Sequence, residues 1–259
     1  VFDVVRARFF RFAFSGPAAA TAAIRINEVL LSGAHRLDKF AAKSGLGLAA
    51  SPDEIAAASE PGVSIARGEV LELTARWHDG RLDWEVPAGE WTLLRLGHTS
   101  TGKTNYPSVA EGKGLEVDKL NRAALDGHYD AFVGKLIHSG TGVSPVESAA
   151  GRRSHDGVPA LTTVHVDSWE VGYQNWTPAF RAEFTRRRGY DPLLWLPAFT
   201  GRVVENDGLT ERFLWDVRRT ISELVNENYA ARMAERAHAD GRLFSLEGYR
   251  NGPFDCLSY

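Results

Sequence analysis

Apolar and polar residues alternate through the first part of the chain with the two-residue period of a β-strand. Every second residue is apolar over 71–77 and again over 82–86. The His-Asp-Gly turn at 78–80 is typical of a hairpin, because glycine adopts positive φ without strain. A further apolar run at 91–96 predicts a third strand of an antiparallel meander. We therefore expect residues 1–87 to form a β-rich, sandwich-like region.

From residue 88 the spacing of apolar residues changes, and strands alternate with helices. Helices are predicted over about 118–137, from Thr177 to the stop at Gly189, and from a cap at Asp207 or Thr210 to about Asp240. The first helix has the stripe Leu125, Tyr129, Phe132 and Leu136, and the last has Phe213, Val217, Ile221, Leu224 and Val225. Buried strands are predicted at 161–166 and 242–246. This alternation indicates an α/β region.

Acidic residues follow both predicted strands of this second region. Asp167 and Glu170 come after the first strand, and Glu247 comes after the second. Loops that follow strands carry the chemistry of α/β barrels, so we expect these three carboxylates on one side of the sheet. Aromatic residues in the same stretch suit stacking on the apolar face of a sugar. The candidates for that contact are Trp169, Tyr173 and Trp176.

Two further carboxylates, Glu116 and Asp118, stand at the predicted start of the helix over 118–137. One interpretation is helix capping, with Asp118 as the N-cap. The other is a carboxylate or metal position facing a sugar site. The same two interpretations apply to Asp167 and Glu170. Among the histidines, which lack the spacing of metal ligands, His98 is a candidate substrate contact.

The stretch 97–104 matches the phosphate-binding pattern G-x-x-x-x-G-K-[ST]. Pro107 lies four residues after Lys103, where it would remove a helical hydrogen bond and clash with a carbonyl. Without a helix N-terminus there is no row of free N–H groups to hold phosphate. We therefore expect a surface loop in irregular backbone here, and reject nucleotide binding.

Composition narrows the classes of partner. The 259 residues carry a net charge of −3, which gives no reason to expect nucleic acid or an acidic membrane surface. No apolar run is long enough to cross a bilayer, so we expect no membrane insertion. Cys256 is the only cysteine, so no disulfide can form within the chain. The chain begins within a strand-like pattern and ends soon after an apolar and acidic strand-end motif with no closing helix, and we interpret it as an internal fragment, truncated at its C-terminus.

Several short runs, in a fixed order, resemble the motifs of one enzyme family. They are PAGEW at 87–91, TGKTN at 101–105, GLEVDKL at 114–120, DSWEVG at 167–172, GYD at 189–191, LP at 196–197, GRVV at 201–204, ERFLWD at 211–216 and GPFD at 252–255. Together they resemble the bacterial α-L-rhamnosidases of glycoside hydrolase family 106. The resemblance covers essentially the whole chain and is strongest from about residue 87.

The resemblance implies a multidomain enzyme with a (β/α)8 catalytic barrel and attached β-sandwiches, of which residues 88–259 would be part of the barrel. It implies removal of terminal α-L-rhamnose with inversion, by two carboxylates and with a bound calcium ion. The DSWE glutamate falls on Glu170, as the expected general acid, and Asp167 is the other candidate catalytic carboxylate in this stretch. Glu247 is a candidate calcium ligand or second acid, although SLEGY departs from the family pattern there.

The resemblance also places the partner carboxylate of Glu170 beyond Tyr259, so the fragment alone is expected to be inactive. A rhamnose-containing glycan or glycoside is the expected partner, and a bacterial periplasmic or secreted location is favoured. A non-catalytic carbohydrate-binding protein, using the β-rich first third, remains the alternative. The sequence leaves open the natural glycan, the oligomeric state and which acid donates the proton.

Overall fold

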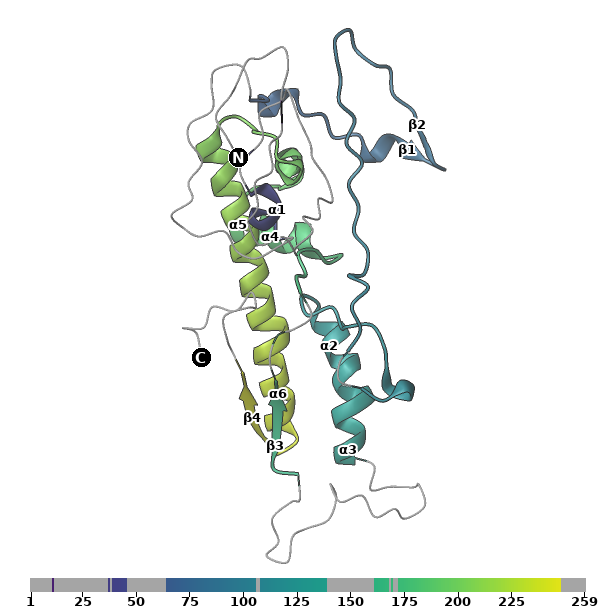
Figure 1. The fold of residues 1–259 in the computed structure, drawn as a ribbon, viewed down its shortest axis with the longest axis vertical. Coiled ribbons are helices and arrows are strands. Elements are labelled where there is room, and N and C mark those ends of the chain that lie inside the picture. Colours follow the sequence, from purple (N-terminus) through teal and green to yellow (C-terminus); the bar gives the residue numbers. More distant parts are fainter. Residues whose placement is uncertain are drawn as a thin grey trace, which may run out of the picture.

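A computed structural model describes residues 11, 37, 39–45, 64–105, 108–138, 161–167, 169 and 172–247. One long helical rod organises them (Figure 1). It consists of α5 (Asp207–Val225), the π-type stretch η6 (Asn226–Ala231) and α6 (Arg232–Ala239). Within this described part of the chain, no helix combines the length and apolarity needed to cross a membrane.

The rod begins at Asn206, whose side-chain oxygen accepts a hydrogen bond from the Leu209 N–H at 2.9 Å. The expected cap is therefore wrong, by one residue for Asp207 and by four for Thr210. The Thr210 hydroxyl instead bonds the Val204 backbone, which ties the rod to the preceding segment. The predicted stripe is confirmed, since all of its members are buried: Phe213, Val217, Ile221, Leu224 and Val225.

A second helical run lies beside the C-terminal half of the rod, which is formed by η6 and α6. It comprises α2 (Arg122–Tyr129), the π-type stretch η4 (Asp130–Gly134) and α3 (Lys135–His138). Its cap is Asn121, which accepts from two backbone N–H groups, so the expected cap at Asp118 is wrong.

The predicted stripe of this second run is only half right. Leu125 and Tyr129 are fully buried, but Phe132 is 59% exposed and Leu136 is 45% exposed. The reason is the π-type stretch, whose wider turn shifts the later residues around the helix axis. Val133 therefore occupies the core position expected for Phe132.

The N-terminal half of the rod, which is formed by α5, packs against α4 (Phe180–Arg188), α1 (Phe40–Lys43) and the 3-10 stretch η5 (Leu193–Thr200). The largest buried cluster lies between these elements. Phe213 is at its centre, with ring centroids of Phe184, Trp195 and Phe199 at 5.8–6.0 Å. As predicted, α4 ends at Gly189, which has a φ of 80°.

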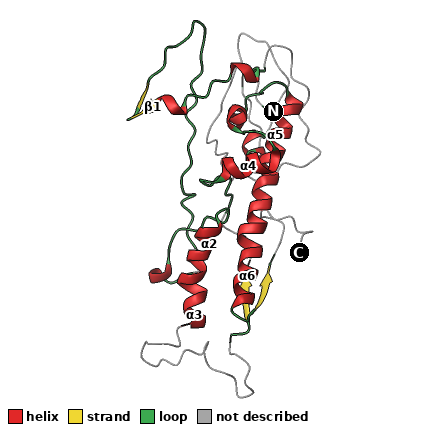
Figure 2. Cartoon of the chain, turned by 180° about the vertical axis from the view of Figure 1, so that it is seen from behind, coloured by secondary structure: helices red, strands yellow, loops and turns green. Residues whose placement is uncertain are grey.

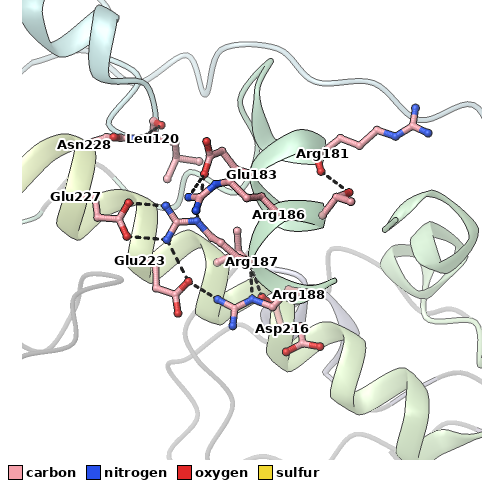
Figure 3. A network of polar contacts seen from close by, with 12 residues as sticks. Leu120, Arg181, Glu183, Arg186, Arg187, Arg188, Asp216, Glu223, Glu227 and Asn228 are labelled. Carbon is pink, nitrogen blue, oxygen red and sulfur yellow. Dashed lines mark hydrogen bonds and ion pairs between the residues drawn. The ribbon is translucent and has the colours of Figure 1, made fainter. Parts of the chain in front are cut away.

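Arginines on α4 link it to the rod along a line of carboxylates (Figure 3). The Arg187 guanidinium bonds Glu183, Glu223 and Glu227, and its side chain is only 9% exposed. Arg188 pairs with Glu223 as well. The crossing of α4 and α5 is therefore held by both packing and charge.

Two parallel strands cover the end of the rod near α6 (Figure 2). These are β3 (Thr163–Val166) and β4 (Leu243–Leu246), paired in parallel from Thr163↔Leu243 to Val166↔Leu246. The chain between them contains α4 and the rod, so strand, helices and strand form one crossover unit. The described strands make two two-stranded sheets, and these residues by themselves close neither a barrel nor a sandwich.

An extended arm precedes the helical region, and we define it as residues 70–105 and 108–116 (Figure 1). Its predicted hairpin is present but short, with β1 (Trp77–His78) antiparallel to β2 (Arg81–Leu82). The turn uses positive φ at Asp79 and Gly80, as the sequence predicts. Short 3-10 turns occur at Arg67–Glu69 (η1), Thr74–Arg76 (η2) and Ala110–Gly112 (η3). The expected strand at 91–96 does not form.

Candidate active site

The parallel register of β3 and β4 places two acidic residues side by side. Val166 of β3 is paired with Leu246 of β4. Asp167 follows Val166 in the chain, and Glu247 follows Leu246. The Glu247 N–H donates to the Val166 carbonyl at 2.9 Å, which continues the ladder past the last paired residues. The expectation that Asp167 and Glu247 lie on one side of the sheet is therefore confirmed. Glu170 lies outside the described residues.

The two faces of this strand pair differ in polarity. One face packs toward α2 and α6 through Val164, with Val166 and Phe244 at its edge. The other carries His165 and Asp167 from β3 and its end, and Ser245 and Glu247 from β4. These residues share a face because side chains alternate along a strand.

The polar face holds a cluster able to bind a cation. One atom each from His165, Asp167 and Glu247 lie within 4.8 Å of one another, and all three residues are exposed. Calcium takes six to eight oxygen ligands, so the two carboxylates fit it and the imidazole does not. The His165 Nδ1 already shares a hydrogen bond with the Ser245 hydroxyl at 2.7 Å. The donor set thus supplies part of a calcium site, with other oxygens required to complete it.

His165 was missed as a site residue from the sequence. It stands two positions before Asp167, and residues two apart on a strand share a face. That spacing was the available signal, although one histidine in a strand more often has a structural role.

The loop after β3 is anchored by Trp169. Its indole is 7% exposed, and its Nε1–H donates to the Gly172 carbonyl at 2.6 Å. The ring packs edge-on against Tyr229 of η6, with centroids 6.1 Å apart. Trp169 was expected to contact sugar, but its burial instead makes it a support for the loop.

The other aromatic candidates are half-buried. Trp176 packs on Phe180 and Phe199, with centroids 4.6 and 6.3 Å apart, as part of the larger core cluster. Tyr173 keeps a partly exposed side chain beside Gly172. Of the three sugar-stacking candidates, Tyr173 therefore has the environment most suited to a ligand.

Glu116 and Asp118 lie against this same loop. Asp118 accepts from the Thr177 hydroxyl at 2.7 Å and from the Leu120 N–H at 3.0 Å. Glu116 pairs with Lys119 at 2.6 Å. Both carboxylates are therefore engaged within the protein, which favours a structural role over direct contact with a sugar.

Lys119 was not singled out from the sequence. Its side chain is 5% exposed, and its ammonium lies over the rings of Trp169 at 5.1 Å and Tyr229 at 5.4 Å. Burial, with the nearby charge of Glu116, raises the pKa of Tyr229 to about 12, so its hydroxyl stays neutral. In the sequence, Lys119 stands beside the acidic residues Glu116 and Asp118, and no pattern there predicts its burial.

His98 lies on the arm, exposed, in a stretch that has neither helix nor strand. The whole of 97–103 is irregular backbone, and Thr104 makes only an isolated bridge with Leu115. The expectation that this stretch is not a phosphate-binding loop is confirmed, since no helix begins at Lys103.

Comparison with known proteins gives a consistent result. A family model for α-L-rhamnosidase matches residues 7–252. A protein from Formosa agariphila, provisionally named a beta-glucuronidase, is 45% identical over 195 residues, which are 74% of this chain and 15% of that protein. The structure of a rhamnosidase from Novosphingobium sp. PP1Y matches with a TM-score of 0.64 and 28% identity, over 85% of this chain and 21% of that one.

The chain thus spans about a fifth or less of the length of these relatives. The family match covers nearly all of it, and the fold agrees with a solved rhamnosidase. The chain therefore belongs to the α-L-rhamnosidase family of glycoside hydrolases, glycoside hydrolase family 106.

Proposed function

We propose that this chain is part of an enzyme that removes terminal α-L-rhamnose from glycans or glycosides, with inversion and by two carboxylates. The observation that carries the proposal is the parallel β3–β4 pair, which brings Asp167 and Glu247 to one edge. A crossover of this kind is the repeating unit of a (β/α)8 barrel. Helices pack on one face of the pair, so its polar face would point into the barrel.

The roles follow from the requirements of the reaction. An inverting glycosidase needs an acid that protonates the leaving oxygen and a base that activates water, roughly 6.5–9.5 Å apart. We assign Glu170, three residues after Asp167 in the strand-end loop, as the acid. Asp167 and Glu247 are too close together to form the acid–base pair by themselves, because they leave no room for that water. The base that acts with Glu170 is expected from another part of the complete enzyme.

Calcium is the proposed cofactor, held by Asp167 and Glu247. A bound calcium ion would supply an oxygen-preferring cation that grips vicinal hydroxyls of rhamnose. The chain's own part is to hold both carboxylates in place through the β3–β4 ladder. Asp167→Asn with Glu247→Gln should weaken calcium binding at least about tenfold by calorimetry. An unchanged affinity would show that calcium does not bind at this edge of the sheet.

The name of the Formosa relative makes a β-glucuronide the second candidate substrate. A uronate carboxylate needs a cation or several N–H donors to receive it. The described side chains at the strand ends are two carboxylates and one imidazole, so only the proposed calcium ion could receive a uronate carboxylate there. Parallel assays of nitrophenyl α-L-rhamnoside and β-D-glucuronide would decide between the two.

Glu170→Gln in the enzyme that contains this chain tests the assignment. Glutamine keeps the shape of glutamate but cannot cycle a proton, so kcat on natural rhamnosides should fall by about 10²–10⁴-fold. Aryl rhamnosides with activated leaving groups need less protonation, so the loss on them should be smaller. The matched control is Glu111→Gln, an exposed carboxylate of the arm, which should leave kcat unchanged. Turnover within a few-fold of wild type would remove Glu170 from the mechanism.

A further inference from the structure

A buried positive charge lies against Trp169, the residue two positions after Asp167. Lys119 is 4% exposed as a residue, and its ammonium pairs with Glu116 at 2.6 Å. Burying a charge is costly unless it is paired, and an apolar side chain would fill the same space at lower cost. A lysine at this position therefore calls for an explanation beyond packing.

The ammonium is held between aromatic rings as well as by the carboxylate. It lies 5.1 Å from the ring centroid of Trp169 and 5.4 Å from that of Tyr229. A cation over an indole face is attracted by the ring quadrupole, and more strongly when water is excluded. The Lys119 side chain thus fixes the Trp169 ring from a third direction, in addition to Tyr229 and the Gly172 carbonyl.

Hydrogen bonds of the backbone around Lys119 connect it with Gln174, which follows β3 in the chain, and with η6. The Lys119 N–H donates to Gln174 Oε1 at 2.9 Å, and Gln174 Nε2 donates to the Val117 carbonyl at 2.8 Å. On the other side, Asn228 of η6 donates to the Leu120 carbonyl at 2.8 Å (Figure 3). The segment 116–120 therefore connects the loop after β3 with the π-type stretch of the rod.

We propose that Lys119 is a positioning residue for the catalytic loop. It acts through Trp169, which directly precedes the proposed acid Glu170 in the chain. By holding that indole, the Glu116–Lys119 pair holds the residue that stands next to Glu170 in the chain. This inference rests on the proposed function of Glu170, but the anchoring of Trp169 by Lys119 is testable without it.

The first arm of the test measures anchoring in this chain. Each of the seven tryptophans is labelled as 5-fluorotryptophan, and the Trp169 fluorine signal is assigned by its loss in Trp169→Phe. Lys119→Met removes the charge with little change of length and should shift and broaden the Trp169 signal. Lys119→Arg restores a cation and should return the signal close to its wild-type position. The control, Lys113→Met on the arm, should leave it unchanged.

The second arm measures kinetics in the enzyme that contains this chain. Lys119→Met should lower kcat on rhamnosides at least about tenfold with KM within about threefold, because positioning affects the transition state more than substrate binding. Lys119→Arg should recover kcat to within about threefold. If Lys119→Met fails to fold because Glu116 is left unpaired, Glu116→Gln with Lys119→Met keeps the charge balance and should show the same loss.

The outcomes separate this inference from the proposed function. A wild-type enzyme inactive on rhamnosides would reject the proposed function, while the Trp169 signal would still report on anchoring. An unchanged Trp169 signal in Lys119→Met, or unchanged kcat in an active enzyme, would overturn the positioning role. A low kcat that Lys119→Arg fails to recover would also overturn it.

Discussion

The described helical region, which lies within 117–247, and the arm both contain regularly spaced apolar residues, yet they bury these residues to different degrees. Around the rod, Phe180, Phe184 and Leu214 are completely buried. On the arm, Trp91 is 41% exposed and Leu93 is 59% exposed. The arm contains the strand-like alternation that elsewhere in proteins marks a half-buried sheet. The comparison shows that an apolar pattern indicates which residues can be buried. They become buried only where another element of the fold packs against them.

The two regions also differ in how their charged residues are used. Around the rod, arginines reach carboxylates on other elements, as Arg187 does with Glu223 and Arg232 does with Asp126. On the arm, the described polar contacts are mostly local, such as that of Glu72 with the Thr74 N–H. Long-range pairs restrict the arrangement of elements, while local ones shape only a turn.

The largest expected difference between the regions comes from deleting one aromatic ring in each. Phe213→Ala should reduce the free energy of unfolding by about 3–5 kcal/mol, because the ring is 1% exposed and its neighbours cannot close the cavity. Trp91→Ala should cost less than about 1.5 kcal/mol, since it loses one edge-on contact with Trp84 and one exposed hydrogen bond to the Pro87 carbonyl. Urea unfolding followed by circular dichroism measures both. Equal losses would mean that the arm is as cooperative as the rod.

The next effect concerns the arginine that joins α4 to the rod. Arg187→Met should cost about 1–3 kcal/mol, because it leaves Glu183 and Glu223 without their shared partner. The cost stays below that of a fully buried pair, since Glu227 is 55% exposed. Arg186→Met removes a neighbouring guanidinium that is 63% exposed and should cost less than about 0.5 kcal/mol. Similar values for both variants would contradict the role given to Arg187.

A third, smaller effect appears with pH. A hydrogen bond from Arg232 holds the pKa of Asp126 below its usual 3.8, and a further one from Arg236 adds to this despite partial burial. The folded state therefore favours the carboxylate. This stability is present above pH 3.8 and is lost as pH falls through the lower folded pKa. Asp126→Asn should flatten the pH dependence of unfolding over that range.

The control for this titration lies on the arm. The pKa of Glu72 is also lowered, by hydrogen bonds from the side chain and backbone of Thr74. Because that contact is local and exposed, Glu72→Gln should leave the pH dependence of unfolding unchanged. An equal flattening in both variants would show that the acid sensitivity is not specific to the rod.

The smallest expected effect is that of a cation–π contact on the arm. Arg95 lies over Trp77 at 4.8 Å, and its removal in Arg95→Ala should cost less than about 0.5 kcal/mol at this exposed position. Arg236 lies over the buried Tyr129 at 4.5 Å and also bonds Asp126, so Arg236→Ala should cost more. The same urea titration compares the two. The reverse order would show that the arm contributes more to stability than its exposure suggests.

Local patterns in the sequence were sufficient to predict elements whose contacts lie close in the chain, and helices long enough to show several repeats of the apolar spacing. The buried stripe of α5, the hairpin turn at Asp79 and Gly80 and the stop at Gly189 follow from spacing and from the backbone freedom of glycine. The strand at 91–96 failed because a strand needs hydrogen bonds from another segment, and alternation alone does not provide one.

The candidate site shows the same limit. The pairing of Asp167 with Glu247 could be predicted, because parallel strands joined by a crossover end at one edge. The burial of Lys119 could not, since it depends on rings from residues 169 and 229, far away in the chain. The exposure of Phe132 could not be predicted either, because no sequence signal marks the π-type stretch that contains it.

The π-type stretch η6 is a place where the length of the rod can change without turning its far end. A π turn holds one residue more than an α turn, so a single deletion within Asn226–Ala231 would favour regular α-helix. Because the wide turn already absorbs the extra residue, the residues after it would keep their angle about the helix axis. Met233 and Ala237 would still face β3 and β4, and the chain would enter β4 in phase. A deletion in the regular helix of α5 would instead rotate everything after it by about 100°. Single-residue gaps in relatives should therefore occur at η6 more often than within α5.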